Sequence, residues 1–214
     1  ILTKKILYWY DNNKRSLPWR KKLSQVKREY YTLVSEFMLQ QTQVATVVPY
    51  FNNFIKDIPS ISSLAKINEY KLLKYWEGLG YYSRVKNLKK TAQILEKNFK
   101  GRLPSTINEL KLLPGIGEYT ANAIMAIGFN KPFIPLDGNI ERVIKRLLNL
   151  KLISEVSKEN LIIKKKILGT SVRASDYAQA LMELGALICR PKNPLCDQCP
   201  LIRNCKSFKN NDFE

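Results

Sequence analysis

Two carboxylates occupy sequence positions that suit acid and electrostatic chemistry. Glu36 lies beside Val34, Phe37 and Met38 on an apolar stripe of helical period. Partial desolvation there would raise the pKa of its carboxyl group and favour the protonated form that a general acid needs. The alternative is a surface glutamate at the edge of the stripe. The second carboxylate, Asp137, follows a glycine turn and a short apolar passage, which together would hold an anion and aim the carboxylate.

The glycine turn lies in the stretch 110–146. Pro114, Gly115 and Gly117 end one helical pattern, and the apolar positions of 121–127 resume it. The unpaired N–H groups at the start of the second helix suit an anion such as a phosphate. The turn is therefore either a phosphate-binding element or an ordinary corner between two helices.

All four cysteines fall in one short segment. Cys189, Cys196, Cys199 and Cys205 are separated by six, two and five residues, and the chain has no histidine. Four thiolates suit structural Zn²⁺ or a [4Fe-4S] cluster, whereas an intracellular setting disfavours disulfides. The spacing favours the iron–sulfur cluster, because zinc knuckles usually use two Cys-x-x-Cys pairs and only one is present. The basic residues of this loop suggest that the metal shapes a DNA-facing surface.

Composition points to a polyanionic partner. The 214 residues include 36 Lys and Arg against 18 Asp and Glu, a formal charge of +18, and 45% of them are hydrophobic. Nucleic acid is the first candidate, and a basic membrane-surface protein is the alternative. No apolar run approaches the roughly 18 residues of a membrane span, and no signal peptide is visible. We expect a soluble, intracellular protein without a membrane partner.

Helical periodicity dominates the chain, so the fold class that we expect is all-α. No segment alternates apolar and polar residues for long. A basic loop is expected at 21–28. The expected helices are 1–11, 30–41, 43–54 with an interruption at Pro49, 61–66, 69–76, 85–99, 121–127, 141–150, 158–168 and 176–188.

Three further features each allow two interpretations. Trp19, flanked by cations, is either a core residue or a base-stacking surface. Gln40 and Gln41 end a predicted helix and either read base edges or cap the junction. The glycine loop 78–84 presents apolar and aromatic side chains beside a cation, which is the composition of a wedge that enters a base stack and also of a buried turn.

Five separated motifs together resemble one family. The cysteine loop 189–205, the hairpin 113–117 and the run 35–44 resemble the helix-hairpin-helix DNA glycosylases. Within them, Leu-Pro-Trp-Arg at 17–20, the Gln-Gln-Thr-Gln of the run 35–44 and the loop 78–84 resemble the MutY family of adenine glycosylases. The resemblance covers the catalytic region, without the further C-terminal domain by which full-length members recognise 8-oxoguanine.

The resemblance implies two helical lobes that bind DNA between them. Residues 26–129 would form a six-helix barrel lobe with the helix-hairpin-helix motif, and 1–25 with 130–214 would form the lobe of a [4Fe-4S] cluster. The segment between Trp19 and Tyr30 is longer and more basic than the family pattern, which leaves the register of Arg20 open. The family also implies a monomer and a cytoplasmic, nucleoid-associated location in a bacterium.

The resemblance also implies a base excision reaction. Glu36 matches the acid that protonates the flipped adenine at N7, and Asp137 matches the carboxylate that stabilises the oxocarbenium-like sugar. Tyr119 matches a tyrosine that assists catalysis, and Asn139 matches a residue that supports the site. The implied substrate is double-stranded DNA with adenine opposite 8-oxoguanine or guanine.

Further positions match residues of the family that hold DNA. The cluster ligands would be the four cysteines, and the phosphate-binding turn would be Gly115 with Gly117. The adenine pocket would contain Arg15, Trp19, Arg20, Leu39 and Gln179. The residues that probe or wedge the opposite base would be Gln41, Thr42, Leu79 and Tyr81.

Three rivals follow from the same motifs. Endonuclease III shares the fold and cluster but uses a hairpin lysine to cleave the backbone, and this chain has Tyr119 at that position. A thymine mismatch glycosylase also has a tyrosine there. A non-catalytic DNA-binding module would not need to retain both Glu36 and Asp137. We therefore expect a monofunctional adenine glycosylase.

Overall fold

The chain is all-helical, as expected. The computed structural model describes residues 2–151 and 172–213, and these residues contain no β-strand. They divide into two compact units. The terminal unit combines Ile1–Arg15 with Asn130–Glu214, and the central unit is Ser16–Phe129.

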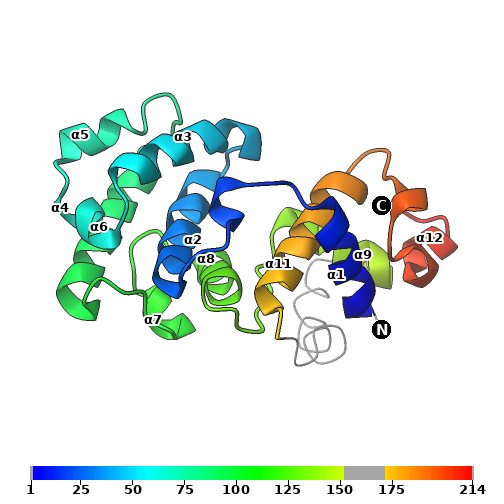
Figure 1. The fold of residues 1–214 in the computed structure, drawn as a ribbon. Coiled ribbons are helices and arrows are strands. Elements are labelled where there is room, and N and C mark those ends of the chain that lie inside the picture. Colours follow the sequence, from blue (N-terminus) through cyan, green and yellow to red (C-terminus); the bar gives the residue numbers. More distant parts are fainter. Residues whose placement is uncertain (1, 152–171, 214) are drawn as a thin grey trace. The chain divides into compact units, whose positions relative to one another are not determined.

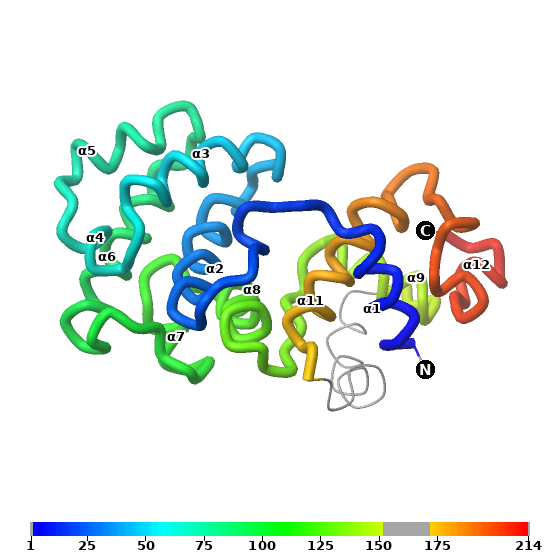
Figure 2. The backbone as a smooth tube through the Cα atoms, viewed as in Figure 1, coloured from blue at the N-terminus to red at the C-terminus, as the bar shows by residue number. Residues whose placement is uncertain are grey.

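The central unit is built around the helix that carries Glu36. This helix, α2, buries nine of its fifteen residues, so it is surrounded by neighbours rather than lying on a surface. It packs against α3, α6 and η2, and Figure 2 shows α4 beside α6 within the same unit. The elements are η1 Pro18–Arg20, α2 Gln25–Leu39, α3 Val44–Asp57, α4 Ile61–Lys66, α5 Glu69–Lys74, α6 Ser83–Phe99, α7 Ile107–Lys111, α8 Glu118–Ala123 and the π-helical η2 Ile124–Gly128.

Two helix boundaries in this unit differ from the sequence expectation. The basic loop expected at 21–28 ends early, because α2 already begins at Gln25. The helix expected to break at Pro49 runs through it from Val44 to Asp57. The missing N–H of a proline costs one helical hydrogen bond, but Val47 and Phe51 are buried on either side of it, so packing outweighs the loss.

The segment before α2 belongs to the central unit. The family resemblance assigned 1–25 to the cluster lobe, whereas the first segment of the terminal unit ends at Arg15 and the central unit begins at Ser16. The physical reason is Trp19, which is buried and packs edge-on against Phe51 with ring centroids 5.1 Å apart. This contact supports the core interpretation of Trp19 over an exposed stacking surface.

The terminal unit brings the beginning of the chain against its last third. Helix α1 Leu2–Asn13 packs on α11 Ala174–Glu183, which Figure 1 shows as a blue and an orange helix side by side. Their shared core includes Ile6, Tyr10 and Tyr177, all nearly or fully buried. The remaining elements are α9 Gly138–Leu148, the π-helical η4 Leu184–Ile188, η5 Cys196–Gln198, η6 Ile202–Asn204 and α12 Lys206–Lys209.

Two sequence expectations for this unit need comment. The helix expected at 176–188 is α11 followed by the π turn η4, so its helical pattern changes after Glu183. The helix expected at 158–168 lies outside the described residues. Of the helices that the structure describes, none is long and apolar enough to cross a membrane.

Candidate active site and DNA-binding elements

Glu36 is enclosed within the central unit. Its side chain is 4% exposed, and Val34, Phe37 and Met38 on the same helix are fully buried. The stripe predicted from the sequence is thus a core stripe, and the surface-glutamate alternative does not hold. The carboxyl group of Glu36 is therefore largely shielded from bulk water.

Asp137 caps the helix that follows it. Its Oδ1 accepts a hydrogen bond from the backbone N–H of Ile140 at 2.7 Å, and its Oδ2 accepts one from Asn139 Nδ2 at 3.2 Å. A carboxylate at the N-terminus of α9 is also stabilised by the helix dipole. The structure therefore holds this carboxylate in one orientation by two hydrogen bonds.

Arg142 extends this arrangement to the cysteine loop. Its Nη2 donates to Asn139 Oδ1 at 2.8 Å and to Gly185 O at 2.9 Å, and its Nε donates to Cys189 O at 2.7 Å. Any Cβ at Gly185 would lie 2.6 Å from Asn139 Cβ, so only glycine permits this approach. Desolvation lowers the pKa of Arg142, although the guanidinium still stays charged near neutrality. Asp137, Asn139, Arg142 and Cys189 thus form one continuous set of contacts.

The glycine hairpin is clamped by the core of the central unit. Gly115 has φ +80, and a Cβ there would lie 2.7 Å from the ring of Phe37. Thr91 Oγ1 donates to Pro114 O at 2.9 Å. Gly117 is the N-cap residue of α8, and a Cβ at this position would meet nothing within 4 Å. The first residue of α8, Glu118, is exposed to solvent. This arrangement suits the phosphate-binding interpretation, because a rigid turn presents an exposed helix start.

Tyr119 is the second residue of α8. It is partly buried and follows the exposed Gly117 by two residues. No lysine occupies this helix, whose sequence is Glu-Tyr-Thr-Ala-Asn-Ala. Helix α8 therefore offers no amine for Schiff-base chemistry. An endonuclease III-like reaction would need a lysine at the position of Tyr119.

The glycine loop exposes its tyrosines and buries its leucine. Tyr81 is 59% exposed and Tyr82 is 43% exposed, whereas Leu79 is only 6% exposed. In this conformation Leu79 fills the interior, which agrees with the buried-turn interpretation for this residue. Gln41 and Thr42, the other candidates for contacting the opposite base, lie in the loop after α2. Gln41 is exposed and Thr42 is half-buried.

The remaining base-pocket candidates have structural partners. Arg15 forms an ion pair with the fully buried Glu183 at 2.6 Å, and Glu183 also accepts the Arg15 backbone N–H. Gln179 Nε2 donates to the carbonyl and hydroxyl oxygens of Ser175, each at 3.2 Å. Leu39 and Arg20 are partly buried in the central unit. Arg15 and Gln179 therefore each form hydrogen bonds within the terminal unit.

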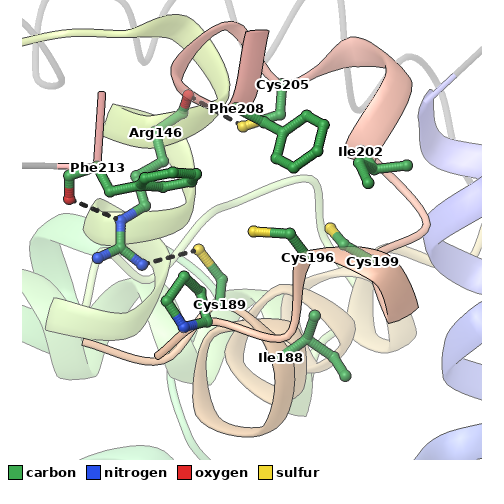
Figure 3. Close-up of a pocket in the computed structure, with 10 residues that line it drawn as sticks. Arg146, Ile188, Cys189, Cys196, Cys199, Ile202, Cys205, Phe208 and Phe213 are labelled. Carbon is green, nitrogen blue, oxygen red and sulfur yellow. Dashed lines mark hydrogen bonds between the residues drawn. The ribbon is translucent and has the colours of Figure 1, made fainter. Parts of the chain in front are cut away.

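The four cysteines surround one apolar cavity, drawn in Figure 3. None of them forms a disulfide. The cavity measures about 30 Å³, and its other walls are mostly apolar. Burial raises the pKa of the Cys199 thiol to about 11, and burial with the neighbouring thiols raises that of Cys196. The apolar lining comprises Ile188, Pro194, Ile202, Phe208 and Phe213.

A buried cation borders the cavity. Arg146 is 8% exposed, and its Nη1 lies 3.6 Å from Cys189 Sγ and 2.7 Å from Arg190 O. Its own carbonyl oxygen accepts a hydrogen bond from Cys205 Sγ at 3.3 Å. A guanidinium placed this way compensates negative charge on thiolates. Within the described ranges, no three Cys, Asp or Glu side chains group closely enough to hold a single metal ion.

Comparison with known sequences identifies the family. Residues 34–167 match the HhH-GPD superfamily base excision DNA repair protein family. The chain belongs to the HhH-GPD superfamily. The matched region contains Glu36, the glycine hairpin and Asp137, so the helix-hairpin-helix resemblance drawn from these motifs is confirmed.

The similar proteins of this superfamily include adenine DNA glycosylases. The chain is 42% identical over 207 residues to the one from Buchnera aphidicola subsp. Baizongia pistaciae, covering 96% of this chain and 58% of the relative. It is 39% identical over 213 residues to the one from Homo sapiens, covering 94% of this chain and 38% of the relative. The chain therefore spans less than two thirds of the length of these relatives.

Solved structures confirm the HhH-GPD fold. A thermostable thymine-DNA glycosylase has a TM-score of 0.84 at 24% identity, with 97% of this chain and 95% of that chain covered. A trapped endonuclease III–DNA covalent intermediate has a TM-score of 0.72 at 21% identity, with 99% of each chain covered. At these identities the likeness shows the fold.

Sequence reasoning did not identify the buried hydrogen-bonding roles of two arginines of this HhH-GPD chain. Arg84 falls on the buried stripe of α6, in register with Val85 and Leu88, which is an unusual place for a cation. Arg142 lies three residues after Asn139 on α9, the spacing that brings helical side chains together. Both signals were present in the helical period, but several of the partners, such as Met38 for Arg84 and Cys189 for Arg142, are distant in sequence.

Proposed function

We propose that this chain is the catalytic region of a monofunctional DNA glycosylase that excises adenine mispaired with 8-oxoguanine or guanine. The observation that carries the proposal is the 42% identity to an adenine DNA glycosylase across 96% of the chain. The formal charge of +18 suits binding to double-stranded DNA. We further propose a monomer that acts in the cytoplasm of a bacterium, at the nucleoid.

Glu36 is the proposed acid. In the reaction, a proton from its carboxyl group passes to N7 of the flipped adenine. The N9–C1′ bond then breaks with its electron pair moving into the base, so adenine leaves as a neutral molecule. Burial of Glu36 at 4% exposure supports this role, because it favours the protonated carboxyl group.

Asp137 is the proposed partner of the sugar. Departure of the base leaves positive charge at C1′, which a fixed carboxylate stabilises until water adds there and releases a proton to solvent. Its two hydrogen bonds support this role, since they fix its orientation before the reaction. We propose that Asn139 positions Asp137 and that Tyr119 assists at the same step. The absence of a lysine in α8 supports hydrolysis without strand cleavage.

Two exposed elements are proposed to hold the duplex. The hairpin with Gly115 and Gly117 would bind a backbone phosphate through the N–H groups at the start of α8. Gln41, Thr42 and Tyr81 would probe the base opposite adenine, and their exposure or partial exposure supports this. Leu79 could join them only after a change of loop conformation.

We propose that Cys189, Cys196, Cys199 and Cys205 hold a [4Fe-4S] cluster. Four thiols around a common apolar cavity, with the Arg146 guanidinium at its edge, support this proposal, because the guanidinium compensates the negative charge of a thiolate-bound centre. The four cysteines would hold the cluster, which would crosslink the loop 189–205 and fix its position. Arg142 bonds both to the Cys189 carbonyl and to Asn139 Oδ1. A fixed loop would therefore also fix the position of Asn139.

The proposed function is tested by single-turnover excision. Duplexes with A:8-oxoguanine, A:G, T:G and thymine glycol are each incubated with excess protein, and products are compared with and without alkali. We expect adenine release, fastest opposite 8-oxoguanine, with strand breaks only after alkali. Preferential thymine release would instead identify a thymine glycosylase, and strand breaks without alkali would indicate an endonuclease III-like lyase.

A further inference from the structure

Arg84 lies beneath two loops of the central unit and bonds to both. Its Nη1 donates to Met38 O at 2.8 Å, to Thr42 Oγ1 at 3.1 Å, and also to Gln40 O. Its Nη2 donates to Leu79 O at 3.2 Å and to Gly80 O at 3.0 Å. One edge of the guanidinium therefore contacts the end of α2, and the other contacts the glycine loop.

The Arg84 guanidinium stabilises the C-terminal end of α2. The last carbonyl groups of α2 lack partners within the helix, as at every helix C-terminus, and a positive charge there is favourable. Arg84 supplies that charge to Met38 O and also reaches Phe37 O at 3.4 Å. At 6% exposure the guanidinium is shielded from water, so its hydrogen bonds have little competition from solvent.

The glycine loop is bound from the same side. Arg84 Nε donates to Tyr81 O at 3.4 Å, and the guanidinium carbon lies 5.3 Å from the Tyr81 ring centroid. It also lies 5.5 Å from the ring of the fully buried Trp76, whose Nε1 donates to Gly80 O at 3.1 Å. Aromatic rings and carbonyl groups thus fix the guanidinium plane against the loop.

Both loops carry a residue in a costly backbone conformation. Gln41 has φ 56 and Tyr81 has φ 49, which is the left-handed region that residues other than glycine rarely adopt. Such conformations persist when surrounding contacts impose them. Arg84 bonds to the carbonyl of the peptide before Gln41 and to the carbonyl of Tyr81 itself. The side chains at both of these strained positions are exposed.

We propose that Arg84 is a positioning residue that holds Gln41 and Tyr81 as one recognition surface for the base opposite adenine. This rests on the proposed function for the identity of that base. Arg84 itself is buried and touches no DNA; it acts by imposing the left-handed backbone on both exposed residues together. Losing its bonds releases the two loops at once, although they are about forty residues apart in sequence.

Two measurements on Arg84→Lys test this role. Lysine keeps the charge but cannot bond both loops in a planar fork. We expect backbone amides of both 40–43 and 78–82 to exchange roughly tenfold faster with solvent. We also expect the ratio of single-turnover rates for A:8-oxoguanine and A:G, normalised to active protein, to fall roughly tenfold, since small misplacements are costly. A purely structural loss would reduce both rates equally.

The matched control is Arg102→Lys, which alters an arginine of the same unit that pairs with Glu29 at 2.7 Å, away from both loops. It should leave the ratio unchanged. Should Arg84→Lys fail to fold, Thr42→Val removes one acceptor of Arg84 and keeps the side-chain shape. We expect it to speed exchange in 78–82 as well as in 40–43.

Three results would overturn parts of this inference. An unchanged ratio in a folded Arg84→Lys protein removes the recognition role. Faster exchange in only one loop removes the joint bracing. If the unaltered protein releases no adenine from either duplex, the proposed function fails and the recognition role fails with it, and hydrogen exchange then decides the bracing alone.

Discussion

Arg142 Nη2 donates to Asn139 Oδ1 at 2.8 Å, and the amide of Asn139 in turn donates to the Asp137 carboxylate. Arg142 also bonds to the carbonyl of Cys189, the first cysteine of the cavity. The candidate sugar-binding carboxylate and the candidate cluster loop are thus joined within one unit by two side chains.

This relationship predicts the effect of Arg142→Gln. Asn139 and the Cys189 carbonyl lose a charged donor, so Asp137 is oriented less firmly. We expect single-turnover adenine excision to slow by roughly tenfold or more while duplex affinity changes little. We expect unfolding free energy to fall by about 1–3 kcal/mol. A variant with normal excision and lowered stability would limit Arg142 to a structural role.

Glu36→Gln tests the acid. The amide occupies the same space but donates no proton to N7, so excision should fall by about 10²–10⁴-fold with duplex binding retained. The control is Glu29→Gln, another buried glutamate of α2, which pairs with Arg102. That variant should lose stability and keep its single-turnover rate. Excision by Glu36→Gln at the normal rate would remove Glu36 as the acid.

Gly115→Ala tests the hairpin. A Cβ would lie 2.7 Å from the Phe37 ring, and φ +80 is strained for alanine, so we expect a loss of about 1–3 kcal/mol in unfolding free energy. Duplex affinity should also weaken. Gly117→Ala, where nothing lies within 4 Å of the added carbon, should leave stability within about 0.5 kcal/mol. Thermal melts and binding curves at two salt concentrations measure both effects. Equal stability of the two variants would contradict the clamped turn.

The Arg15–Glu183 ion pair predicts an asymmetry. Glu183 is fully buried, whereas the Arg15 side chain is 37% exposed. Arg15→Met leaves a buried carboxylate without its cation, while Glu183→Gln leaves a cation that water can still reach. We expect Arg15→Met to cost about 2–4 kcal/mol in urea unfolding and Glu183→Gln to cost clearly less. Equal costs would show that Arg15 contributes mainly through contacts other than charge.

Cys199→Ser tests the cluster. We expect the unaltered protein to contain about four iron atoms per chain and to absorb broadly at about 400 nm, and the variant to lose both. Ser62→Ala, in the central unit and far from the cysteines in sequence, is the control and should keep its iron. Stoichiometric zinc without visible absorption would replace the cluster with a zinc site.

Helical periodicity predicted much of the fold, because it reports which face of each helix is buried. Glu36 beside three core residues and Asp137 ahead of a helix could both be recognised this way. The break expected at Pro49 was wrong, since burial of Val47 and Phe51 outweighs one lost hydrogen bond. The sequence left the glycine loop as either a wedge or a buried turn, because a loop's composition does not reveal which side chain faces inward.

By itself, the sequence determined the all-α class, the cysteine spacing, the positive charge and the positions of the two carboxylates, because these depend on local pattern and residue type. The tertiary structure decided which groups meet. Arg84 contacts carbonyl groups up to 47 residues away, and Arg142 reaches Cys189 across 47 residues. Such contacts form only when separate helices pack, so no local period encodes them, and they are what orient the candidate site.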